Sequence, residues 1–201
     1  MVVRHWMTPN VVTIAKDASI QEALAVMRQH SIRHLPVVDE HHHLHGWVSD
    51  SDLRGALVAS MLEELSVADV MIHKPYTVSP ETALEEATRI IMEKRIGGFP
   101  VVDHGKLTGI ITVVDILAAF ITMMGVLTNS ARVDVRLPAR AEALDQITRL
   151  IQNHKGEILS ICHMPFVQDE DRVYSIRIGG IGAESIAQVL RDQGFEVIAT
   201  S

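Results

Sequence analysis

The stretch GWVSDSDLR occupies residues 46–54, and the related stretch GIITVVDIL occupies residues 109–117. Both contain the pattern Gly-x-x-Ser/Thr-x-x-Asp. In each copy the pattern joins an apolar run typical of a β-strand to a helical spacing of apolar residues. It therefore marks the same strand-to-helix junction twice, and it indicates a duplicated structural unit.

The similarity extends upstream of this junction. A shift of 64 residues lays residues 7–39 over residues 71–103, and one residue missing from the second hairpin reduces the shift to 63 at the junction. The matched pairs include Met7 with Met71, Thr13 with Thr77, and the tetrapeptide Pro-Val-Val-Asp at 36–39 with its copy at 100–103. Self-similarity over this length predicts two copies of one supersecondary unit.

Each copy predicts the element order β-α-β-β-α. A short extended piece at 11–14 or 76–78 precedes a helix, whose apolar residues in the first copy recur at helical spacing from Ile20 to Met27. The Pro-Val-Val-Asp strand follows, and a polar hairpin returns the chain into a second strand. The last helix then begins at the serine or threonine of the junction.

The C-terminal part predicts a different unit. Its order is β-α-β-β-α-β, which is ferredoxin-like, with helices from 141 to about 154 and at 183–192. The small polar segment at 128–131 predicts a linker before it. The sequence thus indicates an α+β protein with repeats at 3–62 and 66–127 and a third domain at 132–201.

Composition limits the classes of partner. The formal net charge is −7 and the positive charge is not concentrated in either part, so nucleic-acid binding is not expected. Cys162 is the single cysteine, which excludes an internal disulfide and predicts a reduced thiol.

The sequence predicts a cytoplasmic protein without a membrane partner. The N-terminus lacks the apolar region of a signal peptide. Residues 110–127 are apolar enough to resemble a membrane span, but Asp115 lies inside them, and a central carboxylate costs roughly 2.5–3.5 kcal/mol on insertion scales. We therefore expect this segment to form a buried strand that runs into a helix.

The two repeats resemble a tandem pair of cystathionine β-synthase (CBS) domains, which covers about residues 3–125. Residues 132–201 resemble an ACT domain, and a CBS pair followed by an ACT domain is the arrangement of acetoin-utilisation protein B-like regulators. The resemblance implies a disc-shaped pair that binds an adenosyl nucleotide in clefts between the repeats. The ligand expected is AMP, ADP or ATP, or else S-adenosylmethionine or a dinucleotide, with no obligatory cofactor.

The junction itself has two interpretations. Ser49 and Asp52 have the spacing of a capping box, and so do Thr112 and Asp115. The same helix start can also hold a phosphate, while the acid accepts from ribose hydroxyls. The residues alone leave both interpretations open. The resemblance implies that the aspartate binds ribose, and it favours the nucleotide.

The two copies are not expected to be equivalent. Arg33 and His34 precede the first Pro-Val-Val-Asp, whereas glycines occupy the matching positions 97 and 98, and Ser51 is matched by a valine. The resemblance implies that these basic residues contact phosphate; alternatively, Arg33 is a solvated cation at a helix end. The resemblance also places Thr13 and Thr77 near the adenine, where ordinary β-propensity is the alternative explanation.

Two features predict a homodimer or a larger assembly. Apolar residues at helical spacing would leave exposed faces, and an ACT-like sheet has a pairing edge. The loop at 136–144 carries Ala139 and Arg140 where amino-acid-binding ACT domains have glycine, so this domain is expected to serve mainly in dimerisation. The apolar residues concerned are Leu57, Met61, Phe120 and Met124.

A histidine cluster lies at the first hairpin. His41, His42, His43 and His45 follow Glu40, and imidazole binds zinc and nickel. No further cysteine or acid completes a defined shell, so we expect solvated side chains at a hairpin tip.

Together these observations predict a non-catalytic regulator that senses an adenosyl nucleotide and acts on a partner enzyme or pathway. A structural adaptor with empty clefts is one alternative. A metal-dependent enzyme that uses the histidines is the other.

Overall fold

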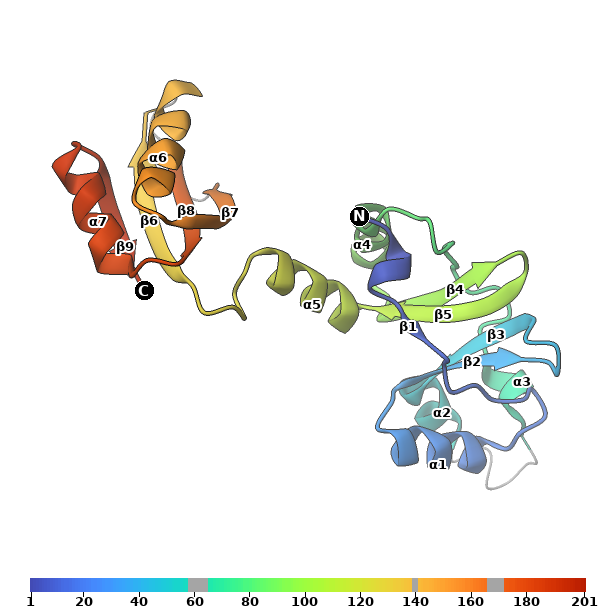
Figure 1. Cartoon of the computed structure of the whole chain (residues 1–201). Coiled ribbons are helices and arrows are strands. Elements are labelled where there is room, and N and C mark those ends of the chain that lie inside the picture. The colour runs from blue at the N-terminus through green and yellow to red at the C-terminus, as the bar shows by residue number, and fades with distance from the viewer. Residues whose placement is uncertain (58–64, 139–140, 166–171) are drawn as a thin grey trace. The chain divides into compact units, whose positions relative to one another are not determined.

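The computed structural model describes residues 1–57, 65–138, 141–165 and 172–201. It divides into two compact units, Met1–Leu117 and Ala118–Ser201 (Figure 1). Two features considered above lie outside the described residues: Met61, and the pair Ala139 and Arg140.

The first repeat contains helix α1 (Ile20–His30), strands β2 (His34–Val38) and β3 (Leu44–Ser49), and helix α2 (Asp50–Ala56). Helix α1 begins where the Ser19 side chain accepts from the Glu22 amide, at 3.1 Å. It ends at Ser31, whose φ of 54° lies in the left-handed region. Its apolar positions are buried, and they cover β2 and β3.

The second repeat has the same backbone in helix α4 (Leu84–Lys94), strands β4 (Gly98–Asp103) and β5 (Lys106–Thr112), and helix α5 (Val113–Met123). His34 lies opposite Ser49 in the first hairpin, and Gly98 lies opposite Thr112 in the second. Both hairpins carry a register shift at the same matched place, after Val37 and after Val101. The repeat predicted from the sequence is thus present in the fold.

The first extended pieces differ from the prediction. Residues 11–14 and 76–78 form no regular strand, and each contributes an isolated parallel bridge, Ile14 to Val37 and Val78 to Val101. Only two hydrogen bonds hold each bridge, because the chain turns away at once; in the first repeat they run from Ile14 N to Pro36 O and from Val38 N to Ile14 O.

The segment that leads into each repeat packs on the other repeat. We call residues 2–9 and 66–72 the leading segments. The first holds a short 3-10 turn (Val3–His5) and strand β1 (Thr8–Pro9), and β1 pairs antiparallel with β5 of the second repeat. The other leading segment holds α3 (Val67–Val70), and its Ile72 pairs with Trp47 of β3 through hydrogen bonds of 3.1 and 2.8 Å.

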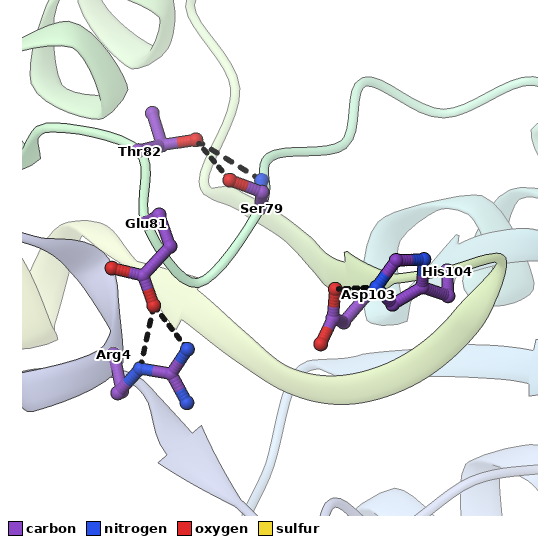
Figure 2. Close-up of polar contacts among 6 residues, drawn as sticks. All are labelled: Arg4, Ser79, Glu81, Thr82, Asp103 and His104. Carbon is purple, nitrogen blue, oxygen red and sulfur yellow. Dashed lines mark hydrogen bonds and ion pairs between the residues drawn. The ribbon is translucent and has the colours of Figure 1, made fainter.

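Each leading segment thus pairs with the other repeat, an arrangement that we call the exchange. Further hydrogen bonds at matched positions support it. Val3 N donates to Thr82 O at 2.9 Å, and Val67 N donates to Ala18 O at 2.8 Å. Both valine side chains are fully buried. Figure 2 shows an additional ion pair on one side, between Arg4 and Glu81, close to the turn in which Ser79 N donates to Thr82 Oγ1.

The second unit is one sheet with two helices. Its strands are β6 (Ala131–Leu137), β7 (Glu157–Met164), β8 (Arg172–Gly179) and β9 (Glu196–Thr200), and its helices are α6 (Ala141–Asn153) and α7 (Ala183–Asp192). The strand order is β7-β8-β6-β9, and every pair is antiparallel. Alternate residues of β6 and β8 are buried against both helices, so the core lies on one face of the sheet.

The apolar stretch at 110–127 is divided between β5 and α5, as expected from Asp115. Among the described residues, no helix has both the length and the apolar character that crossing a membrane requires.

The exchange predicts that the two leading segments stabilise the first unit equally. Val3→Ala and Val67→Ala each remove two buried methyl groups, and each should lower the free energy of unfolding by about 2 kcal/mol. Val114→Ala is the control, because Val114 is 63% exposed and its truncation should cost less than about 0.5 kcal/mol. Urea unfolding measures all three. A control-sized loss for either buried valine would contradict the exchange.

Candidate functional site

A cavity of about 650 Å³ lies in the first unit, where α2 and α5 begin. This volume lies within the range of small-molecule sites. Six of the residues predicted from the sequence line it: Arg33, His34, Ser49, Ser51, Thr112 and Asp115. The cavity therefore brings together residues of both repeats.

The start of α2 is a complete capping box. Ser49 Oγ accepts from Asp52 N at 3.3 Å, and Asp52 Oδ2 accepts from Ser49 N at 3.0 Å. The Ser49 hydroxyl lies 2.6 Å from the same Oδ2. The capping interpretation is thus confirmed. Both contacts to the Asp52 carboxylate end on Oδ2, so Oδ1 has no hydrogen-bond partner among the described residues.

The start of α5 repeats this arrangement. Thr112 N and Thr112 Oγ1 lie 2.8 and 2.6 Å from Asp115 Oδ2, and Asp115 N donates to the threonine hydroxyl at 3.4 Å. Outside the cap, Asp50 N donates to Arg33 O and Val113 N donates to Gly97 O. Because these bonds occupy the first and third amides of each helix, only the second amide remains for an anion.

Arg33 supplies positive charge to the cavity. Its side chain is exposed, and Asp50 also lines the cavity. The hydrogen bond from Arg54, at 2.7 Å, lowers the pKa of Asp50, and the charges of Arg54 and Arg33 lower it further. Asp50 therefore stays ionised and partly balances Arg33.

His34 is held between the two repeats. Its ring stacks on Trp47, with centroids 5.2 Å apart and planes 20° from parallel. Burial lowers the pKa of His34, the neighbouring Arg33 lowers it further, and Asp52 opposes the shift. The neutral imidazole is therefore favoured, which makes His34 a weaker phosphate partner than the cation expected from the sequence.

The remaining predicted residues lie elsewhere. Asp52 supports Ser49 but does not itself line the cavity. Thr13 lines a separate cavity of about 700 Å³ together with His41, His42 and His45. Thr77 is exposed. The two threonines predicted near the adenine are therefore not brought to the cavity in this structure.

The histidine cluster is organised by Asp39, an acid that the sequence analysis did not connect with it. Asp39 Oδ2 lies 3.2 Å from both His43 Nδ1 and His45 Nε2, and Oδ1 accepts from the amides of His41 and His43 at 2.9 Å. Hydrogen bonding, chiefly from the His43 amide, lowers the pKa of Asp39. No group of three metal-ligating side chains is arranged to hold a metal ion in the part of the chain that the structure describes.

The sequence analysis also missed part of the lining. The additional residues are Thr8, Ser31, Ile32, Asp50, Gly97, Ile110, Val113 and Val114. Thr8 and Ile110 are partners in the pairing of β1 with β5, so their place depends on the exchange. Asp50 lies between Ser49 and Ser51, and Ile32 precedes Arg33, so adjacency in the sequence was the signal that could have found these two.

Comparison with known proteins places this site in a family. The CBS domain family matches residues 3–59 and 67–122, more than half of the chain. A crystal structure of CBSX2 from Arabidopsis thaliana in complex with AMP is 32% identical, with a TM-score of 0.56 over 60% of this chain and 96% of that one. A putative acetoin utilization protein (AcuB) from Vibrio cholerae is 31% identical, with a TM-score of 0.58 over 63% and 94%.

A third structure carries a different ligand. The CBS domain pair of MJ0100, in complex with 5′-methylthioadenosine and S-adenosyl-L-methionine, is 28% identical to this chain. Its TM-score is 0.55 over 60% of this chain and 99% of that one.

The lowered pKa of His34 predicts acid sensitivity. The unfolded chain takes up this proton near pH 6.5 and the folded chain only at lower pH, so the stability present above pH 6.5 should fall as the pH drops through the folded pKa. His34→Phe keeps a stacked ring without the titration. Urea unfolding from pH 7.5 to 5 should therefore show a steeper loss for the wild type than for His34→Phe. Parallel curves would contradict the assignment.

Proposed function

Because the chain belongs to the CBS domain family, we propose that it is a non-catalytic regulator that binds an adenosyl nucleotide in the cavity at the starts of α2 and α5. The observation that carries the proposal is that a single cavity is lined by Arg33 and by the starts of both helices. Ser49 represents α2 in this lining, and Thr112 and Asp115 represent α5. The AMP of the CBSX2 structure and the adenosyl ligands of the MJ0100 structure support this ligand class.

Each part of an adenosyl nucleotide has a matching group. A ribose hydroxyl can donate to a carboxylate oxygen that the caps leave open. Asp115 lines the cavity directly, whereas Asp52, which supports Ser49 from outside the lining, needs its open Oδ1 to become accessible when the ligand binds. Phosphate meets the Arg33 guanidinium and the hydroxyls of Ser49 and Ser51, which lie 2.8 Å apart. The adenine meets apolar lining that includes Ile32 and Ile110. A free phosphate or sugar alone would use only part of this lining.

The proposed output is allosteric. A ligand that prefers one arrangement of the repeats shifts the population toward it, and a coupling of about 1–3 kcal/mol is enough. The target is a partner enzyme or pathway in the cytoplasm. The resemblance to acetoin-utilisation protein B-like regulators, supported by the AcuB structure, suggests acetoin utilisation as that pathway.

The second unit is proposed to be an ACT-like dimerisation domain. Its element order and its antiparallel strand order β7-β8-β6-β9 support a ferredoxin-like assignment. Strands β7 and β9 are sheet edges, and Met164 on β7 and Ile198 on β9 are 38% and 47% exposed. Phe120 and Met124 are also exposed, whereas Leu57 packs partly against the first core.

One observation favours the adaptor alternative. Both capping boxes are complete from the chain's own groups, so the junction acids have a structural role that needs no ligand. Ligand binding measured on variants of these acids distinguishes the capping role from the ligand role.

Calorimetry with AMP, ADP, ATP and S-adenosylmethionine tests the function. We expect Asp52→Ala to weaken binding more than Asp115→Ala, because Arg33, Ser49 and Ser51 surround the first junction. Asp69→Ala is the matched control, since Ser66 and Asp69 form a similar capping box outside the cavity lining. Loss of binding in Asp115→Ala alone would reverse the ribose assignment. If none of the four ligands gives a binding signal, the structural adaptor with empty clefts would be the remaining function.

The phosphate contact predicts a difference between AMP and adenosine. AMP should bind more tightly by about 1.5–3 kcal/mol, because adenosine lacks the charge-assisted contacts to Arg33. Arg33→Ala should remove this difference and retain adenosine binding. Thermal shift at matched ligand excess measures both, because a ligand that binds only the folded state raises the melting temperature. Equal shifts by AMP and adenosine in the wild type would exclude a phosphate contact.

The exposed apolar residues and sheet edges predict at least a homodimer. Light scattering at micromolar concentrations should give no less than twice the 22.2 kDa of one chain. A single 22.2 kDa species across that range would contradict the dimer.

A further inference from the structure

We infer that the cavity selects an adenosyl ligand with one phosphate over ligands with two or three, and that Asp50 is the residue that determines this preference. The inference rests on the proposed function and specifies its ligand class. Asp50 lies between Ser49 and Ser51, the two hydroxyls proposed to meet phosphate.

The described lining of the cavity carries more negative than positive charge. Arg33 is its one cationic side chain, whereas Asp50 and Asp115 each supply a carboxylate. His34 adds little positive charge near neutral pH, because burial and the neighbouring Arg33 lower its pKa. The guanidinium of Arg33 can match one phosphate group. A second or third phosphate would enter without a further cation among the lining residues that the structure describes.

Asp50 keeps its negative charge at the cavity. Its side chain is 28% exposed, and the hydrogen bond from Arg54 to Asp50 Oδ2, at 2.7 Å, lowers the Asp50 pKa. Arg54 is 61% exposed and does not itself line the cavity, so it offsets only part of the Asp50 charge there. Asp50 therefore repels an anion that extends beyond the phosphate held by Arg33.

The second repeat offers no compensating group at the matching positions. Under the shift of 63 residues, Val113 matches Asp50 and Val114 matches Ser51. Both valines line the cavity, and they are 46% and 63% exposed. The added phosphates of ADP and ATP would thus meet a carboxylate and exposed methyl groups, and contact with groups that cannot hydrogen-bond makes the loss of water from a charged phosphate unfavourable.

A repulsive group of this kind is a common source of specificity. Proteins discriminate between related ligands by unfavourable contacts to the wrong ligand as well as by favourable contacts to the right one. The carboxylate of Asp50 is partly exposed, so dissolved salt screens its repulsion. The preference for one phosphate should therefore be strongest at low salt.

Calorimetric titration with adenosine, AMP, ADP and ATP tests the preference, with EDTA present because a divalent cation would offset the charge of the phosphates. At low salt the wild type should bind AMP about tenfold more tightly than ATP, with ADP between them, and added salt should narrow the gap. Asp50→Asn removes the charge at nearly constant size and should reduce the ratio of AMP to ATP affinity to about threefold or less. Asp50→Val copies the residue of the second repeat and should reduce the ratio in the same way.

Two further variants are controls. Asp145→Asn removes a similar aspartate–arginine pair, formed with Arg149 on α6 and outside the cavity lining, so the ratio should keep its wild-type value. Arg54→Ala leaves Asp50 without its partner and should raise the ratio above the wild-type value. Each affinity is divided by that for adenosine in the same protein, which removes any general effect of the substitution on the cavity.

Binding of ATP as tight as that of AMP in the wild type would overturn the inference and leave the proposed function standing. An unchanged ratio in the folded Asp50→Asn and Asp50→Val proteins would do the same. If none of the four ligands binds, the proposed function is overturned, and the preference with it. A melting curve for each variant confirms that the chain is folded before the ratios are compared.

Discussion

The reciprocal exchange of leading segments is the constraint on which the first unit depends. Each segment pairs with a strand of the other repeat, and its buried valine and backbone amides are satisfied there. Neither repeat is complete alone, because β1 adds a strand to the second repeat, Ile72 forms a bridge to β3 of the first, and each leading segment contributes a buried valine. The cavity at their junction is therefore lined by residues of both repeats.

The same constraint explains how a symmetric backbone supports an asymmetric site. The hairpin registers, the register shifts and the capped helix starts match in both copies. Side chains at the strand starts then differ freely: Arg33 and His34 in one copy, two glycines in the other. Trp47, held by the second leading segment, supports His34 against Gly97. Duplication supplies the common backbone, and divergence at a few positions gives the two copies different side chains at the cavity.

The sequence predicted the features that depend on interactions between residues close together in the chain. Apolar periodicity located the helices, the capping pattern located both helix starts, and the shift of 64 located the repeat. It could not show which copy a leading segment joins, since both copies offer equivalent strands. It also missed the approach of His34 to Gly97 and of His43 and His45 to Asp39, because these contacts depend on how strands and repeats pack. Thr13 was assigned by resemblance to a cavity that it does not line.

Capping and the proposed ligand contact at the junction acids are compatible, because the caps use only one oxygen of each carboxylate. In each acid the described contacts end on Oδ2, which fixes the carboxylate with its other oxygen directed away from the cap. An acid that is already oriented loses little freedom when a ribose binds, which favours affinity. Helix α5 begins in the cavity lining and continues past Leu117 to Met123. In the proposed regulator, the cap that starts this helix would therefore both stabilise the fold and respond to the ligand.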